Sequence, residues 1–261
     1  MVFTFVSDRL CAPLGRVAAV AMLRRSWRLL RSFSFEQSDP GRFYGPLAED
    51  TAELIVAIAA DMEVSGEPVA VLDVGGGPGY FHRAFASRGM DYVTVEPDVG
   101  EMAAAGISVP ASVRGSGMDL PFRDECFDVV YSSNVAEHVA KPWQMADEML
   151  RVTKPGGVMV LSYTVWLGPF GGHETGLWPH YVGGDFARRR YERVHGRRPK
   201  NVFGESLFAV SCAQGLRWGR RQGAVFFPRY HPWWAWWVVR VPILREFLTS
   251  NLVIVVKKIG G

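Results

Sequence analysis

Short aliphatic runs alternate with amphipathic segments through the middle of the chain. The runs have the length and composition of buried strands, and the segments between them carry apolar positions at helical spacing. Strands are predicted at residues 69–73, 92–96, 129–132 and 158–163, with a short one near Val113. Helices are predicted at residues 47–62, 80–87 and from Pro142 to about residue 152. Strands that alternate with helices form a parallel sheet covered on both faces, so the predicted fold class is α/β and doubly wound.

The pattern loosens after residue 163. Residues 168–184 are rich in Gly, Pro, His and aromatic side chains, and show little periodicity. A helix is predicted at residues 206–214, and strands are predicted at 224–230 and 252–256. Residues 228–248 hold four clustered tryptophans, Trp233, Trp234, Trp236 and Trp237. Such a cluster suits a membrane–water interface or a hydrophobic substrate pocket. It suits equally well a lid over the core that exposes little of its surface, and the sequence does not decide between these alternatives.

One amphipathic helix is predicted near the N-terminus, over residues 17–30. Its apolar face carries Val20, Leu23, Trp27 and Leu30, and its flank carries Arg24, Arg28 and Arg31. A basic amphipathic helix can rest on an anionic membrane surface, or it can dock its apolar face on the protein's own core. The sequence leaves both alternatives open.

The first predicted strand leads into the clearest sign of a ligand site. It ends at Asp73, and glycines follow at alternate positions, Gly75, Gly77 and Gly79. Glycines let a ligand lie close against backbone, and the next helix points its N-terminus at that ligand. A dinucleotide fingerprint has Gly or Ala where this chain has Tyr80, which disfavours a nicotinamide dehydrogenase.

The tighter G-x-G-x-G spacing after an acidic residue resembles motif I of class I S-adenosylmethionine (SAM) methyltransferases. Further matching segments follow in order at residues 93–98, 119–122, 127–130, 132–139 and 151–157. The series, over residues 69–163, resembles the methyltransferase type 11 family, which includes quinone-biosynthesis-type enzymes. The resemblance implies SAM as cofactor and a Rossmann-like, mostly parallel seven-stranded sheet in the order 3-2-1-4-5-7-6. Residues 224–230 and 252–256 would form its terminal antiparallel pair.

Two acidic residues at strand ends are candidates for binding SAM. Asp73 lies above the glycine turn, where a carboxylate can hold the cofactor's amino end. Glu96 falls about 20 residues past the glycines, where the carboxylate that binds the ribose hydroxyls belongs. We therefore expect Asp73, Glu96 and the three alternate glycines to form the cofactor site.

The expected adenine contact departs from the family pattern. Ser116 stands where type 11 enzymes often carry an acidic residue. We expect the backbone of Gly117 and Met118 to hold the adenine instead, with Ser116 as a weak substitute. Asn134 follows the fourth strand, where the family places a residue near the methionine moiety.

Histidines near the same sheet edge are the catalytic candidates. His138 follows the fourth strand, and His173 lies beside Glu174 in the loop after the fifth strand. An imidazole titrates near neutrality, so either histidine can take a proton from an acceptor hydroxyl. His180 and Tyr181 share the second loop and are secondary candidates.

A metal is not expected at this edge. Some quinone-type O-methyltransferases hold a divalent metal here with a Glu-x-x-Glu-His arrangement. In this chain Asn134 replaces the first Glu, which leaves only Glu137 and His138 as ligands. Two protein ligands are weak support for a metal site.

Composition and charge narrow the class of protein. The chain has 261 residues, 48% of them hydrophobic, which suits one α/β domain with extensions. Its three cysteines share no metal or disulfide spacing, which favours thiols in a reducing cytoplasm.

Charge is distributed unevenly along the chain. Residues 1–35 carry +5, residues 36–150 carry −14 and residues 151–261 carry +12, which sum to the net charge of +3. The basic flanks favour an anionic partner, and no apolar run reaches the roughly 20 residues that a membrane span needs.

Together these observations predict an N-terminal helical extension at residues 1–45 and a SAM-dependent methyltransferase domain at 46–261. Its motif core is 69–163, and its aromatic-rich substrate or lid elements are 164–250. The predicted reaction is methylation, on oxygen or carbon, of a small or lipid-like hydrophobic acceptor. The alternatives are a SAM-binding module without catalysis and a nucleic-acid methyltransferase. The basic stretch 188–200 favours the nucleic-acid enzyme, but the chain lacks the Asn-Pro-Pro-aromatic motif of base methylases.

The predicted location is the cytoplasm, with the inner face of the membrane as a surface for peripheral attachment. Such attachment would be driven by the attraction of the basic flanks to anionic lipid and by burial of aromatic side chains in the membrane. The sequence does not fix the oligomeric state.

Overall fold

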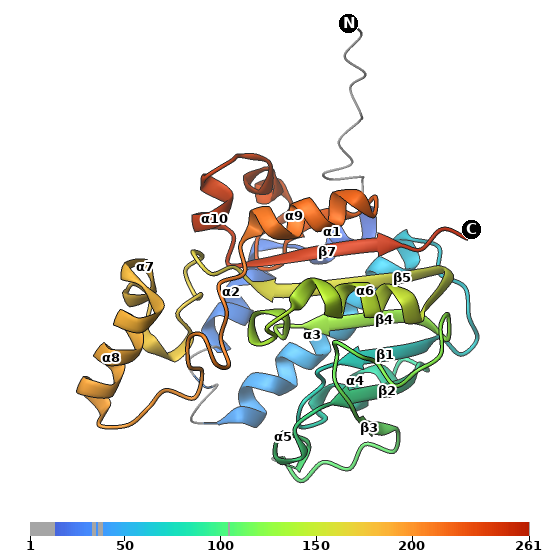
Figure 1. The fold of residues 1–261 in the computed structure, drawn as a ribbon. Coiled ribbons are helices and arrows are strands. Elements are labelled where there is room, and N and C mark those ends of the chain that lie inside the picture. The colour runs from blue at the N-terminus through green and yellow to red at the C-terminus, as the bar shows by residue number, and fades with distance from the viewer. Residues whose placement is uncertain (1–13, 33–34, 36–38, 104, 261) are drawn as a thin grey trace, which may run out of the picture.

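A seven-stranded sheet forms the centre of the computed structural model, which describes residues 14–32, 35, 39–103 and 105–260 (Figure 1). The strands are β1 (Ala70–Val74), β2 (Asp91–Glu96), β3 (Ser112–Arg114), β4 (Phe127–Ser133), β5 (Thr153–Thr164), β6 (Val225–Pro228) and β7 (Asn251–Lys257). Their order in the sheet is β3-β2-β1-β4-β5-β7-β6. Strands β1 to β5 pair in parallel, and β7 runs antiparallel to β5 and β6. The predicted fold class and strand order are confirmed.

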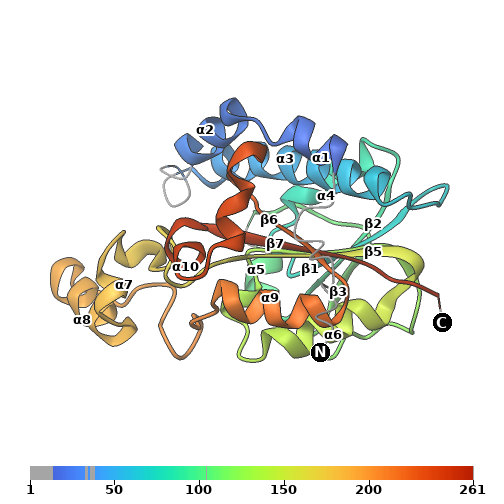
Figure 2. The same ribbon diagram turned by 90° about the horizontal axis from the view of Figure 1, so that it is seen from above.

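Helices cover both faces of this sheet (Figure 2). They are α1 (Gly15–Val20), α2 (Leu23–Ser32), α3 (Pro40–Asp61), α4 (Tyr80–Ala86), α5 (Val99–Ala103), α6 (Pro142–Val152), α7 (Pro179–Val182), α8 (Gly184–His195), α9 (Cys212–Arg221) and α10 (Leu244–Leu248). The 3₁₀ helices of three or more described residues are η2 (Ala136–His138), η3 (His173–Thr175) and η4 (Trp233–Arg240). Helices α1, α3 and α4 pack on one face, and α6 and α9 pack on the other.

Strand side chains alternate between two hydrophobic cores. Val71 and Val129 face α3 and α4, whereas their neighbours Leu72 and Val130 face α6, and all four are fully buried. This period of two is what a strand dictates, and burial on both faces explains the unbroken aliphatic runs in the sequence.

The predicted single helix at 17–30 is wrong, because the chain turns at Ala21 and Met22 between α1 and α2. The first amides of α1 bond to a carboxylate far along the chain: Arg16 N and Val17 N donate to Asp61 at 3.0 to 3.1 Å. An acidic side chain at a helix start satisfies amides that have no partner inside the helix. Helix α1 is therefore fixed by the end of α3.

Helix α2 docks on the protein by a different face from the predicted apolar one. Arg25 and Leu29 are buried, while Leu23 and Trp27 are 62% and 61% exposed. The alternative in which the Leu23 and Trp27 face docks on the core is thus wrong. The side chain of Leu30 lies outside the described residues.

A buried ionic cluster ties α2 to the sheet. Arg25 donates two hydrogen bonds to Asp50 on α3, at 2.6 and 2.8 Å, and a third to the backbone oxygen of Arg229. Arg229, which follows β6, reaches Thr51, Ser133 and Ser162 with its guanidinium group. Each of these charged groups has an exposure of 7% or less. The cluster thus joins segments from three distant parts of the chain.

Three predicted element boundaries are corrected. Helix α3 begins at Pro40 rather than 47, because Asp39 caps it by accepting from Arg42 N, and the expected boundary at 45–46 falls inside this helix. The helix expected at 206–214 is α9, which begins at Cys212 after a capping box between Ser211 and Gln214. Strand β5 begins at Thr153 rather than 158.

The tryptophan cluster lies on η4 at the carboxyl edge of the sheet. Strand β6 runs in the same direction as β5, so the segment after it lies at the edge of the sheet where β1 and β4 also end. Trp236 is buried, but Trp233, Trp234 and Trp237 are 53%, 59% and 52% exposed, so a lid that exposes little is wrong. Among the described residues, no helix is long and apolar enough to cross a membrane.

Candidate functional site

The turn after β1 has a backbone that only glycine adopts without strain. Gly75, Gly77 and Gly79 have φ of 82°, 52° and 87°, in the left-handed region. A Cβ atom at Gly75 would lie 2.6 Å from Val135, and one at Gly79 would lie 2.5 Å from Val109. At Gly77 no other atom lies within 4 Å of that position, so the turn is open there.

Gly76 is a further position of the turn that has no room for a side chain, and the pattern of alternate glycines did not include it. A Cβ atom there would overlap the Thr94 hydroxyl and lie 2.9 Å from the Asp73 carboxylate. The turn is therefore pressed against β1 and β2 on its inner side, and it can accept a ligand only on its outer side.

Glu96 lies at the end of β2, where it was expected, and it holds the glycine turn. Its carboxylate accepts hydrogen bonds from Gly77 N and Asp98 N, both at 3.2 Å. Its exposure is 9%, and this burial raises the pKa of the Glu96 carboxyl against the lowering effect of the two amides. The carboxylate lies beside the open part of the turn, and its contact with a ribose stays a prediction.

Asp73 lies deeper than the sequence suggested. Its Oδ2 atom accepts hydrogen bonds from the hydroxyls of Tyr131 and Tyr92, at 2.5 and 2.6 Å, and its exposure is 2%. Burial raises the pKa of Asp73 to about 7, although the two tyrosine hydroxyls oppose the shift. The carboxyl thus supports the turn from beneath, and a direct contact with the cofactor's amino group stays untested. Sequence reasoning missed both tyrosines, because they meet Asp73 only through strand pairing.

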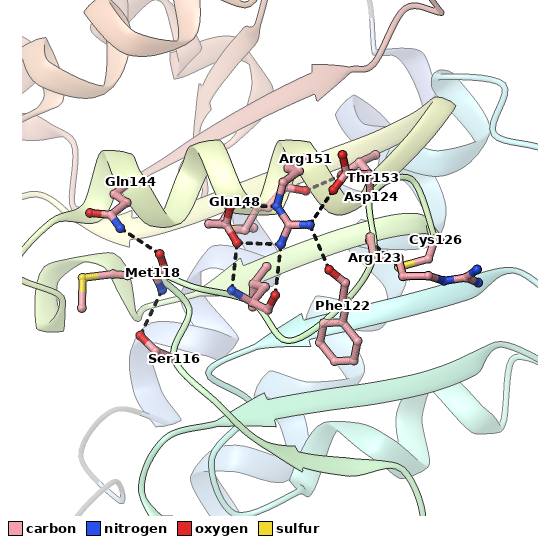
Figure 3. Close-up of polar contacts among 12 residues, drawn as sticks. Ser116, Met118, Phe122, Arg123, Asp124, Cys126, Gln144, Glu148, Arg151 and Thr153 are labelled. Atoms are coloured by element: carbon pink, nitrogen blue, oxygen red, sulfur yellow. Dashed lines mark hydrogen bonds and ion pairs between the residues drawn. The ribbon is translucent and has the colours of Figure 1, made fainter.

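The loop expected near the adenine is held in shape by α6 (Figure 3). Ser116 Oγ accepts a hydrogen bond from Met118 N at 3.2 Å, and Gln144 donates to Met118 O at 2.9 Å. A Cβ atom at Gly117 would lie 3.0 Å from both Met145 and Val74. The three expected residues therefore form one tight turn, and Ser116 uses its hydroxyl within it.

Arg151 fixes the rest of that loop, a role that no sequence pattern indicated. Its guanidinium donates to the backbone oxygens of Leu120 and Phe122, at 3.0 and 2.9 Å, and pairs with Glu148 at 2.7 Å (Figure 3). Glu148 in turn accepts a hydrogen bond from Leu120 N at 2.9 Å.

Asn134 lies at the expected place after β4, in a left-handed conformation with φ of 57°. Asn251 Nδ2 donates to its Oδ1 at 2.6 Å, and Asn134 N donates to Ser162 O at 2.8 Å. A non-glycine residue in this region is uncommon and is held there by its surroundings. The pairing with Asn251 was not visible in the sequence.

The two catalytic candidates lie side by side. Parallel strands β4 and β5 end at the same edge, and the rings of His138 and His173 meet edge to face with centroids 5.0 Å apart. His173 has φ of 47°, a second strained residue at this edge. Burial lowers the pKa of His173, and the nearby Glu137 carboxylate partly offsets this effect.

The expected pairing of His173 with Glu174 is wrong. Glu174 turns away and accepts hydrogen bonds from Asn201 N and Nδ2, at 2.7 and 2.8 Å. The carboxylate beside His173 is that of Glu137, which is 1% exposed. Of the secondary candidates, His180 is buried and bonds to Gly168 O at 3.1 Å, whereas Tyr181 is exposed.

A hollow of about 360 Å³ lies next to η2, between the start of α6 and residues 208–214. Trp143, Phe208 and Val210 contribute apolar lining. Phe208 N donates to Glu137 O at 2.8 Å, which places this lining against η2.

Comparisons with known proteins agree with the fold and the motifs. A family model described as a methyltransferase domain matches residues 72–161. An uncharacterized methyltransferase from Mycobacterium marinum is 59% identical over 94% of this chain and 98% of its own length. One from Mycobacterium tuberculosis is also 59% identical, over 90% of this chain and 95% of its own. A chain from a Haloferax volcanii complex of the Trm112 methyltransferase activator shares the fold, with a TM-score of 0.50 at 18% identity over 87% of this chain and 97% of its own.

Proposed function

Since the chain belongs to the SAM-dependent methyltransferases of the type 11 family, we propose that it methylates a small or lipid-like hydrophobic acceptor, on oxygen or carbon. One observation carries the choice of acceptor: half-exposed tryptophans of η4 lie at the sheet edge that also bears the glycine turn, His138 and His173. Large exposed apolar side chains beside a polar site suit an acceptor that is itself apolar.

The residues at the turn fit SAM. The outer side of Gly77 is open to a ligand, and the Glu96 carboxylate beside it can accept hydrogen bonds from ribose hydroxyls. Within the tight turn, Met118 N and Met118 O already bond to Ser116 and Gln144, so the backbone of Gly117 is the part that can contact an adenine ring. SAM supplies a sulfonium methyl group that reacts by in-line displacement, so the protein has chiefly to position the acceptor and exclude water.

The apolar surroundings of the edge can hold such an acceptor. The hollow beside η2 is large enough for a small molecule and carries Trp143 and Phe208 on its walls. A hydroxyl acceptor must also lose a proton. His173 suits this step because its Nε2 atom is buried and without a hydrogen-bond partner, so its lone pair can take up that proton.

The test is methyl transfer from radiolabelled SAM to lipid and metabolite extracts by the purified protein. We expect label in an apolar product, and His173→Ala should lower turnover by roughly 10²–10⁴-fold while SAM affinity stays unchanged. If His138→Ala shows that loss and His173→Ala does not, the role belongs to His138. SAM binding without transfer to any acceptor would favour a SAM-binding module instead.

A nucleic-acid acceptor is the weaker candidate. Part of the basic stretch 188–200 is neutralised within the chain: Arg188 pairs with Glu192 at 3.0 Å, and Arg198 pairs with Glu205 at 2.7 Å. A phosphate-binding surface needs unpaired cations, so these pairs reduce the support for this alternative.

We also propose peripheral attachment to anionic membrane as the route to a lipid-like acceptor. The surface concerned, called the aromatic rim here, consists of Leu23, Trp27, Trp233, Trp234 and Trp237. Trp233 N donates to Ala21 O at 2.9 Å, so η4 and the start of α2 are neighbours. The exposed Arg24 and Arg28 of α2 add positive charge beside the rim. Tryptophan at the interface and arginine near lipid phosphates both favour such attachment.

A further inference from the structure

Three metal-ligand side chains converge at the carboxyl edge of the sheet. Glu137 and His138 lie on η2, directly after β4, and His173 begins η3 after β5. One ligand atom from each lies within 4.8 Å of the other two. The sequence separates His173 from the other two by more than thirty positions, so only the parallel pairing of β4 with β5 brings it to them. The reason for expecting no metal, a set of only two ligands, therefore no longer holds.

Two of these side chains have buried polar atoms without a partner. Glu137 Oε1 accepts a hydrogen bond from Thr164 N at 3.0 Å, but Glu137 Oε2 has none. His173 Nε2 is likewise buried and unpartnered. A buried carboxylate oxygen or imidazole nitrogen without a partner is costly, and native structures rarely keep one without a role. Both atoms can donate a lone pair to a cation.

The third ligand is already oriented by a neighbouring backbone group. His138 Nδ1 lies 2.7 Å from Ser206 O, a distance at which Nδ1 must carry the proton because a carbonyl only accepts. The lone pair of His138 is therefore on Nε2. A backbone carbonyl that fixes the tautomer in this way is the usual outer partner of a metal-binding histidine.

The ligand types point to a transition metal rather than magnesium or calcium. Two imidazoles and one carboxylate match zinc and similar ions, while magnesium and calcium prefer oxygen ligands. Ligands about 2.0–2.2 Å from one tetrahedral ion lie about 3.3–3.6 Å apart, so the three side chains need to close in by about an ångström. We propose that Glu137, His138 and His173 bind one divalent transition-metal ion, with Zn²⁺ the best match, and leave one coordination position open.

The open position can bind the acceptor, a role that rests on the proposed function. A hydroxyl oxygen of the acceptor that binds there becomes more acidic, and its proton passes to water. That oxygen then forms a bond to the methyl carbon as the carbon–sulfur bond of SAM breaks. The bonding electron pair stays on sulfur, which gives neutral S-adenosylhomocysteine. His173 is in this case a metal ligand and not the base, so loss of turnover in His173→Ala fits either role and cannot separate them.

Measurement of metal binding to the 261-residue chain distinguishes the role of His173 as a metal ligand from its role as a base. Purified protein is freed of metal with a chelator and titrated with Zn²⁺, monitored by calorimetry, and with Co²⁺, monitored by visible absorption. We expect one equivalent of each ion to bind. Glu137→Gln keeps the size of the side chain and an oxygen for Thr164 N, and His173→Asn keeps a polar group. Each should weaken metal binding roughly 100-fold or more while S-adenosylhomocysteine affinity, which reports the fold, is unchanged.

His195→Asn is the matched control, because His195 is exposed at the end of α8, where its ring contacts Tyr191. It should bind metal as the unaltered chain does. Failure of the unaltered chain to take up an equivalent of either ion would overturn the proposal, and so would equal affinity in Glu137→Gln and His173→Asn. Stoichiometric, Glu137-dependent binding together with no methylation of any hydroxyl acceptor would keep the metal site and reject the acceptor part of the proposed function.

Discussion

At the scale of single residues, Glu96 and Asp73 lie near the carboxyl ends of neighbouring strands, but their carboxyl groups have different roles. Glu96 lies beside the open side of the glycine turn, whereas Asp73 lies beneath the turn between two tyrosine hydroxyls. A change at Glu96 should therefore act on cofactor binding, and one at Asp73 should act on the pH dependence of stability.

Glu96→Ala removes the acceptor expected for the ribose hydroxyls. Loss of hydrogen bonds to a charged acceptor should weaken SAM binding by about 1.5–3 kcal/mol, measured by calorimetry. Glu101→Ala is the control, since Glu101 lies on the adjacent α5, is half-exposed and pairs with Lys200 at 3.0 Å. Unchanged SAM affinity in Glu96→Ala would remove Glu96 from the site.

Asp73 predicts a stability that falls as pH rises. Its pKa is raised from 3.8 to about 7 in the folded chain, so the folded state holds a proton that the unfolded state has already released between these values. Stability attributable to Asp73 is then greatest at low pH and is lost toward pH 7, by up to about 4 kcal/mol in total. Asp73→Asn cannot titrate. The difference in unfolding free energy between the two proteins should change between pH 5 and pH 8, and a constant difference would contradict the buried, protonated Asp73.

At the scale of elements, the features predicted best from the sequence are those determined by residues close together in the chain. The aliphatic run of β1 and the glycines after it are local signals, and both were found. Spacing alone located Glu96 at the end of β2, because βαβ units vary little in length. The start of α9 was missed although Ser211 and Gln214 form a capping box, a signal that sequence can carry.

Contacts between distant segments could not be predicted in this way. Asp61 caps α1 across more than forty residues, and Glu137 meets His173 only because β4 and β5 are neighbours in the sheet. The pairing of Glu174 with Asn201 likewise depends on how a loop without periodicity folds back. Such contacts need the strand order and the loop paths, which a single sequence does not contain.

The capping box of α9 gives a prediction at this scale. Ser211→Ala removes the hydroxyl that accepts from Gln214 N at 3.1 Å, and should lower the free energy of unfolding by about 0.5–2 kcal/mol. Urea denaturation measures this change. Ser87→Ala is the comparison, because the Ser87 hydroxyl only donates to Ala84 O at the end of α4, and its cost should stay within about 0.5 kcal/mol. Equal costs for the two substitutions would contradict a special role for the cap.

At the scale of the whole molecule, charge and exposed aromatic area are arranged around one edge. The acidic middle of the chain forms the cofactor half of the sheet, and the basic flanks supply α2 and the segment after β6. The buried cluster of Arg25, Asp50 and Arg229 holds α2 beside that edge. The aromatic rim is thus fixed to the rigid part of the fold.

The rim predicts salt-sensitive binding to anionic vesicles. Flotation should recover the protein with vesicles at low salt and less of it at high salt, because charges outside the apolar contact are screened over about 10 Å at 0.1 M. Replacing Trp233, Trp234 and Trp237 by serine should abolish flotation. Val194→Ser, a 60% exposed apolar residue on α8, is the control and should float normally. Unaltered protein that stays in solution at low salt would reject the membrane proposal.

The position of β7 between β5 and β6 has a consequence for folding of the chain during its synthesis on the ribosome. Translation delivers β5 and then β6, but β6 has no partner in the sheet until β7 has emerged and paired with both. Until then the nascent chain presents the apolar, unpaired edge of β5, which is the kind of strand edge that other chains can capture. We therefore expect ribosome-bound or truncated products that end before Asn251 to require chaperones and to aggregate without them, although they contain every residue of the glycine turn.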